Sequence, residues 1–201
     1  LQTDQIPLSW DYIKDFSSVI AFYPSGTLSY EEGQILGRYL ESGGKLIISG
    51  RIVLYLEQYF GYQFIRKYFG VTSKYTISSP SVTSYESNGP FAGFFFSLTG
   101  DGGANNQEFC EILQKNEEGI PFTPLLRYTD AGKESYAGIS VSNGQYRGIY
   151  LAFGFEGIGH PTSRLEWMRS MLNWLNDTHS VSIQFQDETT PHYVNITKSN
   201  Q

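Results

Sequence analysis

The feature that most constrains the fold is a strand–helix–strand pattern within about thirty residues near the start of the chain. Residues 18–23 are a continuous apolar run, which predicts a strand buried on both faces. Ser29-Tyr-Glu-Glu32 then has the form of a capping box at a helix start, and Gly43-Gly44 supplies a left-handed helix end. Residues 45–49 predict a second buried strand. The unit therefore predicts a right-handed crossover and a parallel sheet.

Further elements are predicted in the middle of the chain. Residues 52–69 are apolar at helical spacing, which indicates two short helices. Residues 71–145 are rich in Ser, Thr, Gly and Asn, and predict short strands and loops. Asn143-Gly144 is a tight-turn signal, so residues 136–141 and 146–153 are expected to pair as a hairpin.

The last third predicts one more buried strand over residues 148–153 and a helix over residues 163–176, the latter beginning with a second capping box. Residues 181–185 alternate apolar and polar side chains, as a strand does. The predicted fold is a three-layer α/β domain over residues 1–178. Its sheet is flavodoxin-like and mostly parallel, with a β-rich insertion in the middle third. Residues 179–201 are expected to be an edge strand or the start of a following domain or linker.

Composition narrows the classes of partner. The 201 residues suffice for one domain with a sizeable core. The formal charge of −6 comes without a basic stripe, which argues against a nucleic-acid partner. No apolar run reaches membrane-spanning length, so no membrane insertion is expected. Cys110 is the single cysteine and forms neither an intrachain disulfide nor a cysteine zinc cluster.

The polar residues give a hint of location. Lysine is scarce, whereas Ser, Thr, Asn, Tyr and Gly are abundant, which favours an extracellular or cell-surface protein. The chain has 15 Tyr and 14 Phe, and such aromatic content is typical both of recognition surfaces and of sheets. Phe91, Phe94, Phe95 and Phe96 form the densest aromatic stretch, which predicts an edge strand or a surface patch.

Two segments carry a resemblance to a known family. The first is Gly43-Gly-Lys-Leu-Ile-Ile-Ser-Gly50, and the second is Phe153-Gly-Phe-Glu156 followed by a helix ending Leu172-Asn-Trp-Leu175. With the strand–helix–strand unit, they resemble class I glutamine amidotransferase-like domains, most closely the modules found inside large secreted microbial proteins. The resemblance covers roughly residues 15–176. It implies a nucleophile elbow after the second strand and a catalytic histidine and acid after the late strand.

The resemblance places Ser49 at the position of the family's catalytic cysteine. The family has small residues two positions away on each side, but here these positions hold Ile47 and Arg51. Arg51 would crowd a turn that needs close backbone approach. We therefore expect a non-catalytic serine whose hydroxyl satisfies a backbone group. Cys110 falls within residues 107–113, which predict a short helix, and is expected to be a small buried apolar residue.

The remaining triad candidates are His160 as base and Glu156 as the group that orients it. Their order is the reverse of the family's His-x-Glu, so the match fails at this point. Glu156 follows a predicted parallel strand, and open α/β sheets bind ligands at that end. Its alternative roles are an ion pair with Arg51 or Arg164 and the capping of a nearby helix. The candidate ligand cleft consists of Gly50, Arg51, Glu156 and His160.

Metal and cofactor sites are not expected. Residues 99–107 are rich in glycine and oxygen-bearing side chains, and Asp101 is the one metal candidate there. The segment lacks the acids of an EF-hand loop, which favours a plain polar loop. No glycine-rich phosphate-binding motif follows a strand. No cofactor is predicted.

Three hypotheses of function remain. The first is a non-catalytic amidotransferase-like module of a larger exported protein, which binds a ligand or packs against neighbouring domains of the same polypeptide. The second is a hydrolase that uses Ser49, His160 and Glu156. The third is a module that binds carbohydrate or peptide through exposed aromatic side chains.

Overall fold

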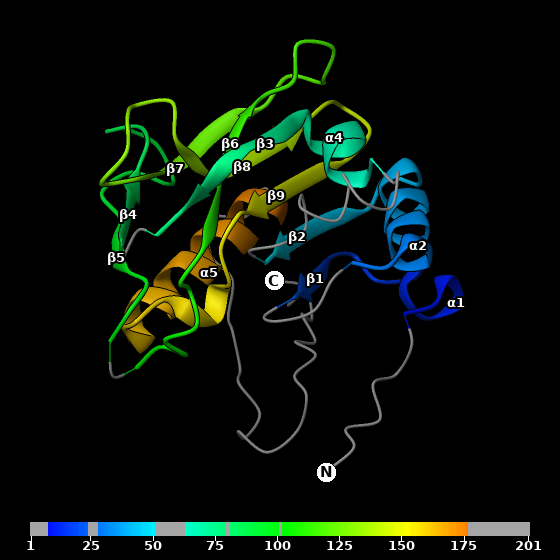
Figure 1. Ribbon diagram of the computed structural model, residues 1–201. Helices are drawn as coiled ribbons and strands as arrows, with labels where there is room; N and C mark the ends of the chain where they lie inside the picture. Colours follow the sequence, from blue (N-terminus) through cyan, green and yellow to red (C-terminus); the bar gives the residue numbers. More distant parts are fainter. Residues whose placement is uncertain (1–7, 24–27, 51–62, 79–80, 101, 177–201) are drawn as a thin grey trace.

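The structure is a computed structural model that describes residues 8–23, 28–50, 63–78, 81–100 and 102–176. Within these ranges the chain forms a nine-stranded sheet with helices on both faces (Figure 1). The strands are β1 (Val19–Phe22), β2 (Lys45–Ser49), β3 (Val71–Ile77), β4 (Ser81–Ser84), β5 (Phe95–Ser97), β6 (Cys110–Lys115), β7 (Thr123–Tyr128), β8 (Tyr136–Ser142) and β9 (Arg147–Leu151). The helices are α1 (Trp10–Ile13), α2 (Tyr30–Glu41), α4 (Phe64–Phe69), the 3-10 turn η1 (Phe155–Gly157) and α5 (Pro161–Asn176).

The sheet has a parallel part and an antiparallel part. Strands β1, β2 and β9 are parallel neighbours, with Ile20 beside Ile47 and Ile47 beside Ile149. The sheet continues through β8, β7, β4 and β5 by antiparallel pairing, and β3 joins through β6, which touches β8. The α/β class and the β-rich insertion are confirmed. Parallel pairing is confined to β1, β2 and β9. The tight turn between β8 and β9 makes that pair antiparallel, and the other strands of the insertion also pair antiparallel.

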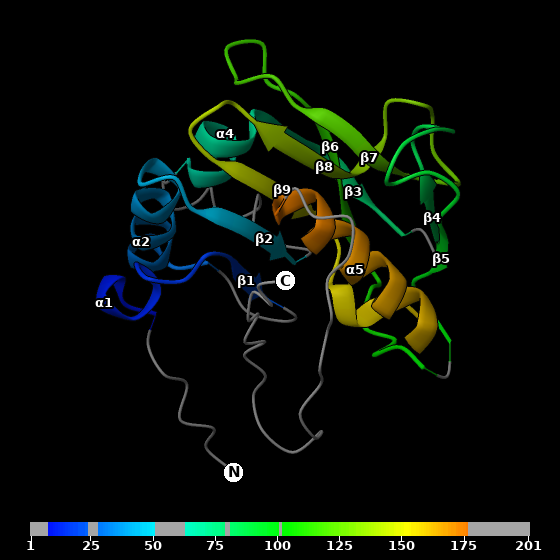
Figure 2. The ribbon, with the colours of Figure 1, turned by 180° about the vertical axis from the view of Figure 1, so that it is seen from behind.

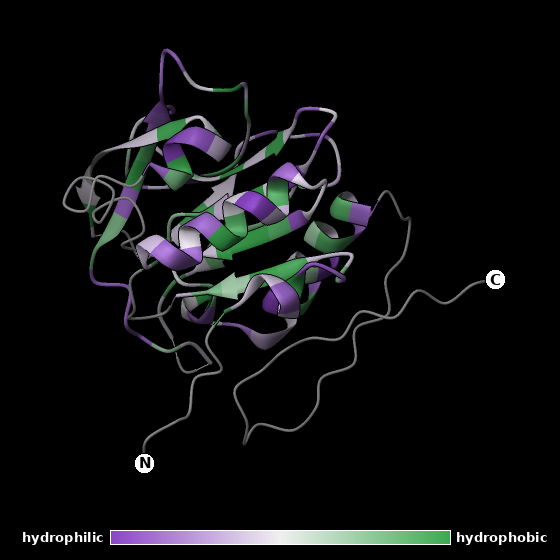
Figure 3. Cartoon of the chain, turned by 90° about the vertical axis from the view of Figure 1, so that its right-hand side faces the viewer, coloured by the Kyte–Doolittle hydropathy of each residue, from purple (hydrophilic) through white to green (hydrophobic). Residues whose placement is uncertain are grey.

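Helices cover both faces of the parallel strands and give the molecule three layers (Figure 2). Leu46 and Ile48 point into a core shared with α2 and α4, whereas Ile47 points into a core shared with α5. Alternate side chains of a strand lie on opposite faces, so a run that is apolar at every position serves both cores. Figure 3 shows these apolar strands between the helices.

Helix α2 begins and ends as its sequence predicts. The Ser29 side chain accepts a hydrogen bond from the Glu32 N–H at 3.2 Å, and the Glu32 carboxylate accepts one from the Ser29 N–H at 2.8 Å. This is the reciprocal capping box. Gly43 follows the helix with a φ of 93°, which only glycine adopts without strain.

The turn between β8 and β9 also follows the prediction. The Asn143 side-chain oxygen accepts hydrogen bonds from the N–H groups of Gln145 and Tyr146, at 3.1 and 3.0 Å. Gly144 has a φ of 85°, as a tight hairpin turn requires. The predicted hairpin is therefore confirmed.

One predicted helix differs from the structure, and another lies outside the described ranges. Residues 107–113 do not form a helix, because Cys110–Lys115 is strand β6, paired with β3. Its first four residues are buried, since the strand is covered on both faces, and a short apolar run of this kind does not distinguish helix from strand. Of the two helices expected over residues 52–69, α4 is the second, and residues 51–62 lie outside the described ranges.

Helix α5 starts at Pro161, two residues before the predicted capping box. Proline suits the first helical position because its missing N–H would have no helical partner there. At the other end, the Asn176 side-chain oxygen accepts hydrogen bonds from the Ser18 hydroxyl at 3.3 Å and from the Lys45 ammonium at 3.2 Å. The helix thus runs from the carboxyl ends of the parallel strands back to their amino ends. The predicted strand at residues 181–185 lies outside the described ranges.

The aromatic stretch is mostly interior. Phe91, Phe94 and Phe96 pack edge-on against Trp167 of α5, with ring centroids 4.9–5.4 Å apart. Phe95 is 63% exposed on the edge strand β5. Three of the four rings are therefore used to attach the insertion to α5, and the solvent-facing aromatic patch expected by the third hypothesis is reduced to one ring.

Candidate functional site

The carboxyl ends of the three parallel strands meet at one edge of the sheet. Phe22 lies beside Ser49, and Ser49 lies beside Leu151, so β1, β2 and β9 end together. Open α/β sheets bind ligands outside these ends because the loops that follow the strands can diverge there. The predicted triad and cleft residues end or follow β2 and β9 in the sequence, whereas the metal candidate Asp101 does not.

Ser49 is buried at the end of β2, with 1% of its surface exposed. Its hydroxyl donates a hydrogen bond to the Phe153 carbonyl at 2.7 Å and accepts one from the Phe155 N–H at 2.8 Å. The hydroxyl proton therefore points at a carbonyl oxygen, which cannot act as a general base. In this arrangement Ser49 joins β2 to the segment after β9.

Gly50 continues β2 by one more backbone hydrogen bond, from its N–H to the Leu151 carbonyl at 3.2 Å. A Cβ at this position would lie 2.8 Å from the Tyr23 carbonyl oxygen, so a side chain does not fit without movement of the backbone. Glycine is required here by close contact between the ends of β1 and β2. Arg51, the next candidate, lies outside the described ranges.

The Glu156 carboxylate is held by two neutral side-chain amides. Its Oε1 accepts hydrogen bonds from Asn106 Nδ2 and from Gln107 Nε2, both at 3.1 Å. Gln107 is 5% exposed, and its own oxygen accepts a hydrogen bond from the Gly154 N–H at 2.7 Å. The two amides belong to the insertion, so they connect it to the end of β9. Sequence reasoning missed both, since an isolated Asn-Gln pair carries no motif.

Arg164 does not form the ion pair with Glu156 that was considered from the sequence. Its guanidinium donates to the carbonyl oxygens of Ile158, at 2.8 Å, and Gly102. The same two loops touch through glycines, because a Cβ at Gly102 would collide with the Gly159 carbonyl. Arg164 therefore fastens the loop before β6 to the loop before α5.

His160 is exposed immediately before α5, and its carbonyl accepts the Arg164 N–H at 3.1 Å. Among the hydrogen bonds of the described residues, none joins its imidazole to Ser49 or Glu156. The structure thus brings Ser49, Gly50 and Glu156 to one edge of the sheet, where the Ser49 hydroxyl and Glu156 Oε1 are hydrogen-bonded to other partners.

The metal candidate Asp101 lies outside the described ranges. Next to it, the Asn105 side-chain oxygen accepts the Gly100 N–H at 2.8 Å and its nitrogen donates back to the Gly100 carbonyl at 3.1 Å. These bonds close the loop on itself. In the part of the chain that the structure describes, no three metal-ligating side chains come together.

An aromatic pair lies at the same edge and was not predicted. Phe22, at the end of β1, stacks on Phe155 with ring centroids 5.3 Å apart and an interplanar angle of 12°. Phe22 is 40% exposed, and Phe155 is partly buried against the α5 core. The pair gives the carboxyl edge an apolar face next to the Glu156 carboxylate.

A buried acid also lies near this edge. Glu111 of β6 is 1% exposed, and the Tyr150 hydroxyl donates to its Oε2 at 3.5 Å. The Glu111 N–H donates to the carbonyl of Ala152, one residue after β9. The sequence analysis did not single out Glu111, which lies in the segment that was expected to be a short helix.

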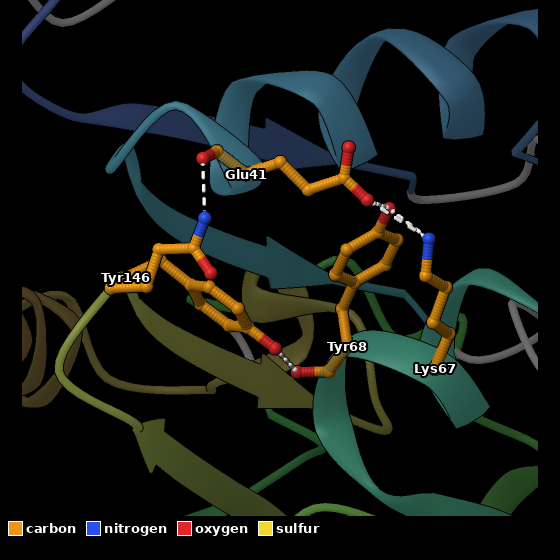
Figure 4. Close-up of polar contacts among 5 residues, drawn as sticks. Glu41, Lys67, Tyr68 and Tyr146 are labelled. Atoms are coloured by element: carbon orange, nitrogen blue, oxygen red, sulfur yellow. Dashed lines mark hydrogen bonds and ion pairs between the residues drawn. The ribbon is translucent and has the colours of Figure 1, made fainter.

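A second polar cluster lies at the opposite end of the sheet (Figure 4). The Tyr68 hydroxyl donates to Glu41 at 2.6 Å, and Lys67 donates to both, at 2.8 and 2.9 Å. The hydrogen bond from Tyr68, followed by that from Lys67, lowers the pKa of Glu41. Burial, followed by the bond to Glu41, raises the pKa of Tyr68. The cluster ties α2 to α4.

Tyr146 extends this cluster toward β9. Its hydroxyl donates to the Tyr68 carbonyl at 2.8 Å, and burial raises the pKa of Tyr146 to about 12.

An open polar hollow of about 460 Å³ lies beside α4, lined in part by Arg66 and Asn116. One nitrogen of the Arg66 guanidinium donates to the Asn116 side-chain oxygen at 3.3 Å within the hollow. These contacts are structural connections between elements.

Comparisons with known proteins give likeness in structure. The chain matches Gan42B, a GH42 beta-galactosidase from G. stearothermophilus, with a TM-score of 0.55 at 16% identity, over 85% of this chain and 23% of that one. It matches the mmIFT52 N-terminal domain with a TM-score of 0.56 at 14% identity, over 86% and 82% of the two chains. A putative ThuA-like protein from Bacteroides uniformis matches with a TM-score of 0.55 at 16% identity, over 84% and 74%.

These likenesses concern the fold. No protein-family model matches the sequence, and no curated protein does. The chain spans about a quarter of the length of the beta-galactosidases it matches. The ThuA-like protein is 16% identical to the chain, so this match supports the α/β fold and does not assign a family. Among the described helices, none has the length and apolar character needed to cross a bilayer.

Proposed function

We propose that this chain is a non-catalytic amidotransferase-like module of a larger exported protein, and that it packs against a neighbouring domain or binds a ligand through the carboxyl edge of β1, β2 and β9. The observation that carries the proposal is the state of Ser49. Its hydroxyl is buried, donates a hydrogen bond to the Phe153 carbonyl and accepts one from the Phe155 N–H. A nucleophile needs an exposed hydroxyl and an adjacent base.

The binding role is supported by the stacked pair of Phe22 and Phe155. Exposed aromatic rings beside a polar rim are typical of the centre of an interface. Glu156 supplies a carboxylate at that rim, held by Asn106 and Gln107. The match to about a quarter of each beta-galactosidase supports the idea that this fold can serve as one part of a longer protein. Export and a cell-surface location are proposed on composition alone.

A covalent probe distinguishes this proposal from the hydrolase hypothesis. The full chain is incubated with a fluorophosphonate, which labels activated serines, and the product is examined by intact mass and peptide mapping. We expect no adduct at Ser49, and hydrolysis of p-nitrophenyl acetate no faster in the native chain than in Ser49→Ala. An adduct at Ser49 that disappears in His160→Ala would establish the hydrolase instead.

The edge itself is tested with the detached neighbouring domain of the parent protein, or with arrayed glycans and peptides, as binding partners. Phe22→Ala and Phe155→Ala are expected to weaken binding at least about tenfold, because the ring pair is the apolar centre of the surface. Phe95→Ala is the matched control, since Phe95 is an exposed ring on the far strand β5. Equal loss with Phe95→Ala would favour a surface at β5 and contradict the proposed edge.

A further inference from the structure

One edge of the sheet is open in the described part of the chain. Strand β1 is the last strand on its side and pairs there with β2 alone. The Tyr23 N–H, just after β1, donates to the Ser49 carbonyl at 2.8 Å. Successive residues of a strand direct their backbone groups to opposite sides, so the N–H and C=O groups of Ile20 and Phe22 point away from β2.

Exposed apolar side chains occur in and near this edge strand in the sequence. Four of those in the described ranges are Phe22, the last residue of β1, Tyr12 and Phe16 before the strand, and Tyr30 after it. Ile20 is only partly buried against the α5 core. An open strand edge among exposed apolar groups is a place where another strand adds, because it leaves both backbone groups and apolar surface unsatisfied.

The chain leaves α5 beside the start of this edge. Asn176, the last residue of α5, accepts a hydrogen bond from Ser18, which directly precedes β1. The four residues 177–180 then lead to residues 181–185, in which Val181, Ile183 and Phe185 alternate with Ser182 and Gln184. Connections between a helix and a strand commonly have about two to six residues, so the spacing is sufficient.

The handedness of the connection also fits. The crossover from β1 to β2 moves across the sheet in one direction with α2 on one face. A crossover from β9 to the outer side of β1 would move in the opposite direction with α5 on the opposite face. These two arrangements are related by a half-turn about the strand axis and so have the same hand, the one that parallel crossovers almost always take.

We propose that residues 181–185 add a strand to the free edge of β1, parallel to it. Val181, Ile183 and Phe185 then lie on the α5 side of the sheet, beside Ile20 and Phe22, whose side chains are incompletely covered there. The short connection from α5 favours this segment over a second copy of the chain, because it keeps the segment at a high effective concentration next to β1. The inference does not depend on the proposed function, although both involve Phe22: the added strand would flank its side chain, and the proposed binding edge uses its ring stacked on Phe155.

The test is amide hydrogen exchange in the full chain, followed by NMR. We expect slow exchange at Ile20 and Phe22, whose N–H groups would bond to the added strand. Ile183→Lys places a charge on its apolar side and should speed exchange at both amides at least about tenfold. Gln184→Lys, on its polar side, is the matched control and should leave both amides slow. Slow exchange at Ile149 in the central strand β9 shows that each variant is folded.

Two results would overturn the proposal. One is exchange at Ile20 and Phe22 that is as fast in the native chain as in Ile183→Lys. The other is protection that appears only at high protein concentration together with a doubled mass, which would assign the edge to a second copy of the chain.

Discussion

At the scale of single residues, Ser49 and Gln107 connect strand ends to the loops that cover them. Each is a buried polar side chain with both donor and acceptor used on backbone or side-chain partners. The sequence allowed the position of Ser49 to be predicted, because it ends an apolar run. It did not predict the hydrogen-bond partners of Ser49, because Phe153 and Phe155 lie about a hundred residues further along the chain. They come near Ser49 only when β2 pairs with β9 in the folded sheet.

Ser49→Ala is expected to lower the free energy of unfolding by about 1–3 kcal/mol, because the Phe155 N–H loses its buried acceptor. Urea unfolding followed by circular dichroism measures the change. Ser87→Ala is the control, since Ser87 is exposed, and its effect should stay within about 0.5 kcal/mol. A neutral Ser49→Ala would mean that the hydroxyl does not hold the end of β2.

At the scale of elements, the sequence predicted correctly the features that depend on interactions between residues close together in the chain. The capping box of α2 and the Asn143 turn formed as expected, since each depends on residues within a few positions. Strand β6 was mistaken for a helix, because its state depends on pairing with β3. The antiparallel order of the insertion was likewise beyond prediction, since short polar strands have no periodicity that fixes their neighbours.

Gly70, which ends α4, offers a test at this scale. Its φ is 68°, and a Cβ there would collide with the Ile120 carbonyl. Gly89 has a φ of 96° with open space around it, so it shares the backbone strain without the collision. Gly89→Ala should cost about 1–2 kcal/mol of unfolding free energy, whereas Gly70→Ala should cost more. Equal losses of unfolding free energy in the two variants, measured by thermal unfolding, would show that backbone strain alone accounts for the need for glycine at position 70.

At the scale of the whole molecule, two cores share one sheet. Strand β2 contributes to both, through Ile48 on one face and Ile47 on the other. The three-layer arrangement could be predicted from its runs of apolar residues, whereas the way the insertion attaches to α5 could not. That attachment depends on Trp167, which three phenylalanines of the insertion surround.

Trp167→Ala is expected to cost about 3–5 kcal/mol of unfolding free energy, because it leaves a large cavity between α5 and the insertion. Phe95→Ala, on the exposed side of β5, should cost less than about 1 kcal/mol. Near-ultraviolet and far-ultraviolet circular dichroism should give the same urea midpoint, because both cores depend on the same strands. Separate midpoints would mean that the insertion unfolds by itself.

The pairing of β2 with β9 has a consequence for how the molecule assembles. Ser49 lies beside Leu151 in the finished sheet, so the central pair closes a loop of about a hundred residues. On the ribosome, β2 is synthesised after β1 and α2 but well before β9 and α5, so its β9-facing edge and its Ile47 face stay uncovered until the insertion and α5 have emerged. Such a high contact order implies slow folding and a period in which chaperones can bind β2.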